Sequence, residues 1–489
     1  MERNAIISTS DKSDLERSSF FLIDQGYNLF CTSGTKAYLD DKGVKCEPIE
    51  KITLTPEILG GRIKTLSFNL LAGILARTRD DEEIRKFGCK PIDLVYVEPY
   101  DFRGKFLAGE TDLTEFIDIG GITLLRSAAK NFSRVIPVVG RKNMEKVTAE
   151  MKDGEVSLDL RRFLASEVFR FTSWYDFVVS EWFGGEGNIF SVAGQSISDL
   201  RYGENPHQKA HAYATYNPFF EIVKEGKEIS FNNIMDAWAS WDLVLRLGQG
   251  SSSVIKHAAP CGAAIGHDSL RKAFESDPIS AYGGVVAVNS QVDEAVTEYL
   301  KGKYIEVLIA KDFSGNALDA LLKRKNLRVL RGREEAYKIP DIRSAGNLLL
   351  VQEWNRKSNL KIEIKSGEAS QRIIEDVKFG WEIVKSVKSN AIVIVSDGWL
   401  ISSCGGQPNR VDSVKIAIDR AKEKGRITND SLLISDGFFP FPDSIEYMWS
   451  NGIHNVAAPT GSVRDDEVIS LANKYGMNFI DVGERGFKH

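Results

Sequence analysis

The feature that most constrains the fold is an alternation of short apolar runs with longer amphipathic segments. An apolar run at residues 5–7 precedes an amphipathic segment at 11–26, and a second run follows at 27–30. The alternation continues to the apolar runs at 92–97 and 135–139. Strands that alternate with helices are typical of a mostly parallel sheet covered on both faces. The first part of the chain is therefore predicted to be an α/β domain.

A change in amino-acid composition near residue 190 indicates a domain boundary. A Gly-rich stretch at 184–187 is followed by small and polar residues at 191–196. Beyond it, a helical pattern at 371–388 precedes two apolar runs separated by Asp397-Gly398, a good hairpin signal. We expect a first domain at 1–193, a linker at 194–200 and a second domain at 201–489 with two subdomains that divide near 360.

Composition excludes several classes of protein. The 63 Lys and Arg against 68 Asp and Glu give a net charge of -5, without a long block of like charge, which disfavours nucleic-acid and membrane-surface binding. Five scattered cysteines without a Cys-x-x-Cys pair favour reduced thiols and a cytoplasmic location. No run of about 18 apolar residues is present, so neither a membrane span nor a signal peptide is expected.

Three segments of the first part carry groups suited to an anion. Residues 32–36, Thr-Ser-Gly-Thr-Lys, stand where a strand is expected to end and a helix to begin. Arg62 and Lys64 lie two residues apart, and Asp118 precedes a helical pattern that contains Lys130. Each motif alone is more typical of a helix cap or a solvated face. Together they suit a phosphorylated ligand at the carboxyl ends of parallel strands.

The second part carries a different set of reactive groups. Residues 201–208 are dense in hydrogen-bonding side chains, and Lys256-His257 follows an apolar strand pattern. A histidine at a strand end can act as a general base or acid. Residues 260–264 lack the second cysteine and the His-x-Glu of zinc deaminases, so no metal is expected. The aromatic segment 438–442 could stack a planar heterocycle or form a buried turn.

In this order, the motifs resemble those of the AICAR transformylase/IMP cyclohydrolase family. The similar segments span nearly the whole chain: 10–12, 32–36, 61–66, 118–131, 201–208, 256–262, 277–284, 388–390, 407–413, 435–442 and 485–489. The resemblance implies an N-terminal methylglyoxal-synthase-like parallel-sheet domain. It also implies a C-terminal part of two cytidine-deaminase-like subdomains without zinc.

The resemblance further implies two reactions and a homodimer with transformylase sites at its interface. A formyl group would pass from 10-formyltetrahydrofolate to AICAR, and formyl-AICAR would then close to IMP, without a metal. The catalytic residues implied are Lys256 and His257 for transfer, and Lys64, Tyr100, Asp118 and Lys130 for closure. Substrate binding for formyl transfer would involve Arg201, Tyr202, Gly283, Glu306, Asn390, Arg410, Phe438, Pro440, Phe441 and Arg485. Substrate binding for closure would involve Ser10, Lys12, Ser33, Gly34, Thr35, Arg62, Thr65, Gly120 and Gly121.

Some positions depart from the family pattern, and most concern ring closure. Ser67-Phe68 replace a His-Pro pair, Glu98-Pro99-Tyr100-Asp101 replace a segment with an asparagine, and residues 402–407 replace a Gly-rich loop. Two alternatives therefore stay open. One is a transformylase whose N-terminal domain only binds nucleotide, and the other is a non-catalytic purine-nucleotide sensor.

Overall fold

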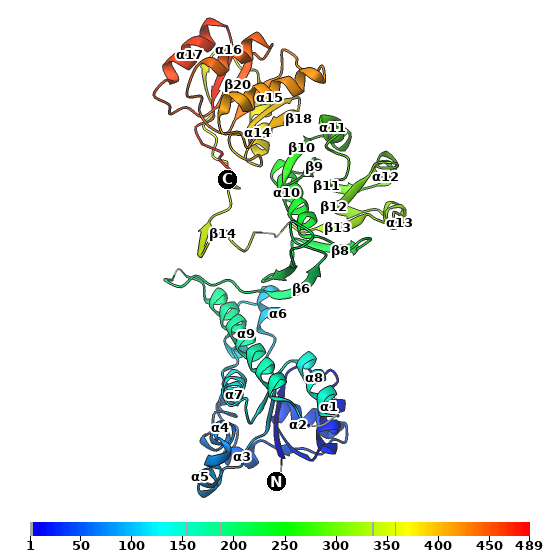
Figure 1. Cartoon of the computed structure of the whole chain (residues 1–489), viewed down its shortest axis with the longest axis vertical. Coiled ribbons are helices and arrows are strands. Elements are labelled where there is room, and N and C mark those ends of the chain that lie inside the picture. Colours follow the sequence, from blue (N-terminus) through cyan, green and yellow to red (C-terminus); the bar gives the residue numbers. More distant parts are fainter. Residues whose placement is uncertain (1–2, 153–154, 186, 335–336, 357) are drawn as a thin grey trace. The chain divides into compact units, whose positions relative to one another are not determined.

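The computed structural model divides the chain into two compact units, Met1–Gln195 and Ser196–His489 (Figure 1). It describes residues 3–152, 155–185, 187–334, 337–356 and 358–489. Within these ranges, no helix is both long enough and apolar enough to cross a membrane.

The first unit contains a five-stranded parallel sheet, which confirms the predicted α/β class. The strand order is β3-β2-β1-β4-β5. The strands are β1 (Arg3–Thr9), β2 (Tyr27–Cys31), β3 (Glu47–Pro48), β4 (Leu94–Glu98) and β5 (Ile136–Val139). Because strand order reverses between β1 and β4, the carboxyl ends of these two strands flank the position where such sheets usually bind ligands.

Helices cover both faces of this sheet. One apolar core lies between the sheet and helices α1 and α8, and the other lies between the sheet and helices α4, α7 and α9. The helices are α1 (Leu15–Asp24), α2 (Ser33–Asp41), α3 (Glu50–Thr53), α4 (Phe68–Leu75), α5 (Asp81–Lys86), α6 (Phe102–Leu107), α7 (Ile119–Lys130), α8 (Arg141–Met151) and α9 (Leu158–Phe183), with 3-10 turns at Leu59–Gly61, Thr78–Asp80 and Thr114–Phe116. Helix α1 starts later than predicted because residues 11–14 form a turn in which Asp14 has a positive φ of 55°.

The second unit is built on one mixed sheet of twelve strands, in the order β16-β21-β20-β19-β17-β18-β10-β9-β11-β12-β13-β8. The strands of one half are β8 (Phe220–Lys224), β9 (Ser252–Lys256), β10 (Ala259–Ala264), β11 (Gly284–Val292), β12 (Ile305–Phe313) and β13 (Arg328–Gly332). Those of the other half are β16 (Glu363–Ser366), β17 (Ile392–Ser396), β18 (Trp399–Cys404), β19 (Leu432–Ser435), β20 (Asn455–Ala458) and β21 (Asn478–Asp481).

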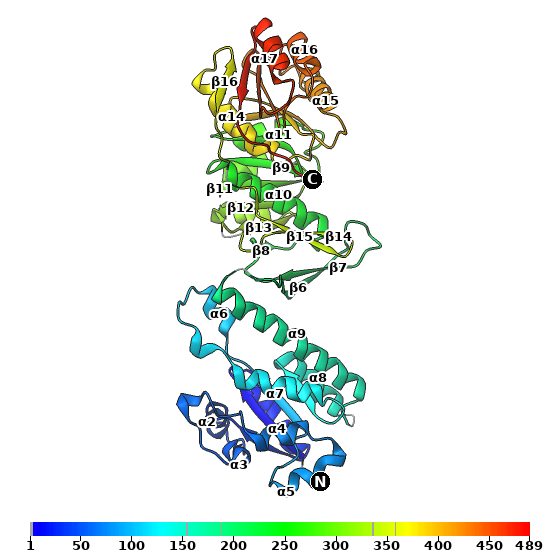
Figure 2. The same cartoon turned by 90° about the vertical axis from the view of Figure 1, so that its left-hand side faces the viewer.

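The two halves repeat one topology. In each half, a helix leads into an antiparallel hairpin, β9–β10 or β17–β18. The first strand of the hairpin also pairs with the next strand outward, β11 for β9 and β19 for β17. The halves join where Ala264 of β10 pairs with Trp399 of β18. The leading helices, α10 (Phe231–Leu247) and α14 (Gln371–Val384), pack side by side (Figure 2). The hairpin predicted around Asp397-Gly398 is thus confirmed, and α14 ends four residues before the predicted end.

Smaller elements complete the second unit. The remaining helices are α11 (Ser269–Ser276), α12 (Glu294–Tyr299), α13 (Gly315–Leu322), α15 (Arg410–Glu423), α16 (Asp443–Ser450) and α17 (Asp465–Lys474). Strand β6 (Gln195–Leu200) occupies the stretch expected to be a linker and pairs with β7 (Ala210–Ala214). A ribbon of β14 (Asp341–Ala345) and β15 (Leu348–Gln352) is separate from the large sheet.

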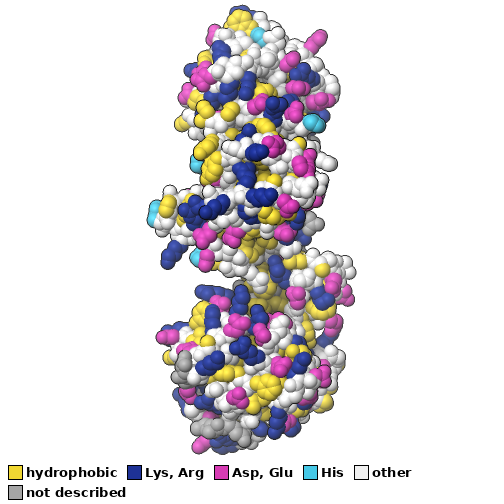
Figure 3. Space-filling view, turned by 90° about the vertical axis from the view of Figure 1, so that its right-hand side faces the viewer, with side chains coloured by type: hydrophobic (Ala, Val, Ile, Leu, Met, Phe, Trp, Pro, Cys, Tyr) yellow, Lys and Arg dark blue, Asp and Glu magenta, His cyan; other side chains and the backbone are white. Residues whose placement is uncertain are grey.

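Charged side chains are mixed over the surface. On the face shown in Figure 3, Lys and Arg side chains lie among Asp and Glu side chains over much of the visible area. This distribution agrees with the near balance of charges in the sequence and with the absence of a long block of like charge.

Candidate active sites

In the first unit, most of the predicted site residues lie at the carboxyl edge of the parallel sheet. Ser10 follows β1, residues 32–36 follow β2, and Tyr100 follows β4. Asp118 is the N-cap of α7, the helix that leads back into β5. Loops at the carboxyl ends of parallel strands meet at one edge, so the fold gathers these side chains around the β1–β4 switch point.

Thr35 and Lys12 form the centre of the expected phosphate site. The Thr35 hydroxyl oxygen accepts hydrogen bonds from the Thr9 backbone N–H and from Lys12 Nζ, both at 3.1 Å. Lys12 Nζ also donates to the Thr9 carbonyl oxygen. Burial lowers the pKa of Lys12, and the nearby Lys64 charge acts in the same direction. An ammonium group beside the N-terminal turn of α2 suits a phosphate dianion.

Lys64, Tyr100 and Asp118 form the second part of this site. Lys64 Nζ donates a hydrogen bond of 3.0 Å to the Tyr100 hydroxyl oxygen. The Asp118 carboxylate caps α7 by accepting from the Gly121 N–H at 2.6 Å. Burial raises the pKa of Asp118, although the Gly121 N–H and the Lys64 charge oppose the rise. A carboxyl group of raised pKa next to an ammonium can exchange protons with a bound substrate.

Two glycines at the start of α7 keep this site compact. A Cβ on Gly120 would come within 2.2 Å of the Thr65 hydroxyl oxygen, and a Cβ on Gly121 would come within 2.6 Å of the Asp118 carboxylate. The segment that carries Lys64 and Thr65 therefore lies directly against the start of α7. Gly34 lies in the first turn of α2, where a Cβ would meet nothing within 4 Å.

The structure does not bring every predicted residue of the first unit to this cluster. Lys130 is the last residue of α7, roughly 18 Å along the helix axis from Asp118 at 1.5 Å per residue. Arg62 forms an exposed ion pair with Glu115, and Ser33 donates to Glu57 at 2.5 Å. The sequence pattern indicated which face of the helix carries Lys130. It did not show that Lys130 lies at the opposite end of the helix from Asp118.

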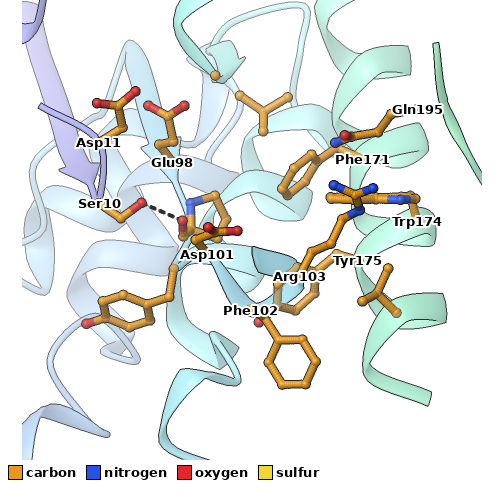
Figure 4. Close-up of a pocket in the computed structure, with 15 residues that line it drawn as sticks. Ser10, Asp11, Glu98, Asp101, Phe102, Arg103, Phe171, Trp174, Tyr175 and Gln195 are labelled. Carbon is orange, nitrogen blue, oxygen red and sulfur yellow. Dashed lines mark hydrogen bonds between the residues drawn. The ribbon is translucent and has the colours of Figure 1, made fainter. Parts of the chain in front are cut away.

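A cavity of about 450 Å³ adjoins the cluster (Figure 4). Ser10 and Tyr100 line it, together with residues that sequence reasoning missed, including Arg103, Trp174 and Tyr175. The Tyr175 hydroxyl oxygen accepts a hydrogen bond of 2.7 Å from the Asp118 backbone N–H. Tyr175 lies on α9, and the sequence of this helix shows only the apolar pattern of a core helix, which does not indicate a site residue.

The two acidic departures from the family pattern have separate environments. The Asp101 carboxylate accepts from the Gly104 N–H at 2.8 Å and thereby caps α6. Glu98 lines the cavity on the same side as Asp11 (Figure 4), and burial followed by the Asp11 charge raises its pKa. A carboxyl that holds its proton more readily opposes a developing negative charge less than an ionised one does.

In the second unit, Lys256 and His257 lie at the tip of the β9–β10 hairpin. Lys256 pairs with Ala259, so His257 and Ala258 form a two-residue turn with positive φ angles of 54° and 56°. The Asp236 carboxylate of α10 accepts from both turn N–H groups, at 3.3 Å from His257 and 2.7 Å from Ala258. Lys256 Nζ donates to the Tyr282 carbonyl oxygen at 2.7 Å. This turn provides the bend that two neighbouring residues need to serve one site.

Other predicted residues of the first half lie around α10 and β12. Glu306 accepts a hydrogen bond of 2.8 Å from the Asn233 side-chain amide, a partner that sequence reasoning missed. The Arg201 guanidinium lies 5.2 Å from the centre of the Tyr202 ring. Gly283, with a φ of 71°, donates to the Tyr304 carbonyl oxygen at 2.8 Å and directly follows the residue that binds Lys256.

Arg410 organises the predicted residues of the second half. Its guanidinium is buried, forms an ion pair with Asp436, and donates to Asn390 Oδ1 and to the Ser435 hydroxyl, both at 2.8 Å. Arg485 lies 4.6 Å from the centre of the Phe487 ring, and Arg410 lies 5.9 Å from it. The C-terminal segment is thus held against the loop that carries Asn390.

The aromatic segment 438–442 presents two rings outward. Phe438 is 39% exposed and Phe441 is 50% exposed, whereas Phe439 is 1% exposed and belongs to the core beneath. Pro440 is exposed between them. The segment is therefore anchored by one buried ring and presents two exposed rings to a planar ligand, with the Arg464 guanidinium 4.9 Å from the centre of the Phe441 ring.

The two groups of the second unit lie at the same edge of the sheet. Strand β18 runs antiparallel to β10, so its end approaches the start of β10, and the Ser403 hydroxyl donates to the Pro260 carbonyl oxygen at 3.0 Å. The Asn390 amide in turn donates to the Gln407 carbonyl oxygen at 3.0 Å, just beyond β18. This geometry places the loop of Asn390 at the edge that carries the His257 turn.

Among the residues that the structure describes, no three His, Cys, Asp or Glu side chains are grouped so that they could hold a metal ion. The five cysteines are free thiols. The side chains at both sites are proton-transfer groups, cations and aromatic rings. Their geometry defines the class: a two-unit α/β enzyme with an anion site in one unit and a Lys–His hairpin in the other.

Comparisons with known proteins identify the family. Residues 18–123 match the MGS-like domain, and residues 128–420 match the AICARFT/IMPCHase bienzyme. The bifunctional purine biosynthesis protein PurH of Aquifex aeolicus is 41% identical over 99% of this chain and its own full length. PurH of Bacillus cereus strain AH820 is 38% identical over the full length of both chains. The crystal structure of ForH is 33% identical over 38% of this chain and all of ForH, with a TM-score of 0.34.

The chain belongs to the AICAR transformylase/IMP cyclohydrolase bienzyme family. It is a bifunctional enzyme of purine biosynthesis that formylates AICAR and closes the product to IMP. The resemblance stated from the motifs is confirmed. The comparisons favour this bifunctional activity over the monofunctional alternative and the non-catalytic sensor.

Proposed function

We propose that the second unit catalyses formyl transfer from 10-formyltetrahydrofolate and that the first unit catalyses ring closure. The boundaries proposed are 1–193 for the cyclohydrolase domain, 194–200 for the connection and 201–489 for the transformylase part. The observation that carries the proposal is that two reactive clusters lie in separate units. Lys64 is hydrogen-bonded to Tyr100 in one unit, and the Lys256–His257 turn lies in the other.

Formyl transfer needs a base at the attacking amine. The AICAR amine is a weak nucleophile because its lone pair is delocalised into the ring and the carboxamide. His257 removes the proton of this amine as it attacks the formyl carbon, and Lys256 stabilises the negative charge that develops on the formyl oxygen. The bond between the formyl carbon and the folate nitrogen then breaks, and that nitrogen takes up a proton, which releases tetrahydrofolate. The exposure of His257 at a hairpin tip supports this role, because a substrate can reach the imidazole there.

The remaining residues of the second unit bind the two substrates. Arg201, Tyr202 and Arg485 hold the phosphate and ribose of AICAR, while Glu306 and Asn390 orient its base. The exposed rings of Phe438 and Phe441, with Pro440, form a wall for the base and the pterin. Gly283 and Arg410 shape the loops that carry these groups.

Ring closure is intramolecular and depends on positioning and charge. The carboxamide nitrogen attacks the formyl carbon, and the formyl oxygen leaves as water. Lys64 stabilises the charge on that oxygen, with Tyr100 as its hydrogen-bond partner, and Asp118 transfers protons. Lys12, Thr35 and the start of α2 bind the phosphate.

We further propose a homodimer that contains the transformylase sites at its interface and acts in the cytoplasm. The β14–β15 ribbon supports dimerisation, since Leu348, Leu349 and Leu350 are each more than half exposed. A two-stranded ribbon with such an apolar surface is marginally stable alone and is typical of an interaction surface. Sedimentation that shows an active 54.5 kDa monomer would contradict this proposal.

His257→Ala tests the division of labour between the units. The variant is expected to lose at least ~10²-fold in formyl transfer because its general base is missing. Closure of supplied formyl-AICAR is expected to stay at the wild-type rate. Tetrahydrofolate and IMP are followed separately. Equal losses in both reactions would show that the two activities are not divided as proposed.

A further inference from the structure

The β9–β10 turn breaks the local rule for two-residue hairpins. Both of its central residues have positive φ, 54° at His257 and 56° at Ala258. Such turns favour Asn-Gly or Asp-Gly, because residues with a Cβ other than Asn, Asp and His rarely adopt positive φ, and Ala258 is none of these. A His-Ala pair therefore needs a partner outside the turn to hold this conformation.

Asp236 is that partner. Its two carboxylate oxygens accept separately from the His257 N–H at 3.3 Å and the Ala258 N–H at 2.7 Å. We infer that Asp236 is a positioning residue for formyl transfer, whose carboxylate holds the turn so that the His257 imidazole faces the reacting amine. This inference rests on the proposed role of His257.

The other half of the sheet contains an equivalent turn, also held by a helix carboxylate, but without a Lys-His pair. Asp376 of α14 accepts from the Asp397 N–H and the Gly398 N–H, both at 2.8 Å. These turn residues also have positive φ, 55° and 62°. Asp-Gly adopts this turn readily, so here the carboxylate stabilises a turn that its own sequence already favours. Asp376 is therefore a matched control for Asp236.

The same helix face also positions a second group of the site. Asn233 lies one turn before Asp236 on α10, and residues three apart share a helix face. Its side-chain amide is buried and donates to Glu306 at 2.8 Å. Helix α10 thus aligns the His257 turn and Glu306 from one rigid element, which is how a site is held at fixed geometry.

Asp236→Asn tests the inference in the full-length protein. An asparagine keeps the shape, but its amide group offers one acceptor where two N–H donors need partners. The kcat of formyl transfer is expected to fall at least ~10-fold, because small displacements of a reacting group are costly. The KM for AICAR and the rate of ring closure are expected to stay near the wild-type values, a split that a general loss of structure would not produce.

Asp376→Asn is the control, and Ala258→Gly is the rescue. Asp376→Asn removes an equivalent hydrogen bond and should keep kcat, even where it lowers the melting temperature as much as Asp236→Asn does. Asp236→Asn should lower kcat less in the Ala258→Gly background than in the wild-type protein, since glycine adopts positive φ freely.

Three outcomes would overturn the inference. They are an unchanged kcat in Asp236→Asn, an equal loss of kcat in Asp376→Asn, or no recovery when glycine replaces Ala258. Retention of formyl transfer by His257→Ala would instead refute the proposed role of His257, and this inference with it. The two failures are therefore distinguishable.

Discussion

At the scale of single residues, the proposed ring-closure site relies on the charge of one lysine, Lys64. Lys64→Ala removes the ammonium that binds the Tyr100 hydroxyl and that we propose stabilises the departing oxygen. We expect IMP formation from formyl-AICAR to be lost, and formyl-AICAR to accumulate when AICAR and the folate are supplied together. Chromatography of the nucleotides measures both.

The control for this prediction is another lysine of the same unit. Lys51 forms an exposed ion pair with Glu47 away from the cluster, so Lys51→Ala should leave both reactions unchanged. If the wild-type protein itself accumulates formyl-AICAR without forming IMP, the first unit binds nucleotide and does not close the ring.

Glu98 makes the stability of the first unit depend on pH. Its raised pKa means that the folded protein keeps a proton that the unfolded chain has already lost. The contribution of Glu98 to stability therefore falls as the pH rises from the ordinary glutamate range through the raised folded value. Glu98→Gln should remove this contribution and so make the change in urea midpoint between pH 4 and pH 7 less unfavourable than in the wild type. Glu82→Gln, at an exposed position, is the control and should keep the wild-type pH dependence. The role of Glu98 would be contradicted if Glu98→Gln kept the wild-type change in urea midpoint, or if Glu82→Gln altered that change as much as Glu98→Gln does.

At the scale of elements, the second unit depends on a close approach between β10 and α11. A Cβ on Gly262 would lie 1.8 Å from the Ala273 carbonyl oxygen, so Gly262→Ala must push the helix away from the strand. We expect a loss of about 1–3 kcal/mol in the free energy of unfolding, the usual range for overpacking. Gly315→Ala in α13 meets nothing within 4 Å and should be neutral or slightly stabilising. Urea unfolding of both variants measures the difference.

At the scale of the whole molecule, the two units have separate cores, which predicts independent folding of the first. A fragment of residues 1–193 should fold alone and bind a purine monophosphate, because its sheet and both helical layers lie within Met1–Gln195. Circular dichroism and calorimetric titration test this. An insoluble fragment, together with a full chain that melts in one transition, would show that the units depend on each other.

The local parts of this protein could be predicted from its sequence. The alternation of apolar and amphipathic segments gave the parallel sheet, and Asp397-Gly398 gave the β17–β18 hairpin, because both signals depend on neighbouring residues. The reactive pair Lys256–His257 and the segment 32–36 were found for the same reason, since each motif is continuous in the chain.

Only the tertiary structure decided which distant residues meet. Asp236 holds a turn 21 and 22 residues away, Tyr175 binds the backbone of Asp118 from another helix, and Lys130 lies at the far end of α7. No short sequence period signalled the repeat of two half-sheets, because the repeat consists of strand order, and only the family resemblance implied two similar subdomains. The sequence by itself determined the elements and the reactive groups, whose signals are local. The contacts that orient those groups are set by packing between segments far apart in the chain, and no local pattern encodes them.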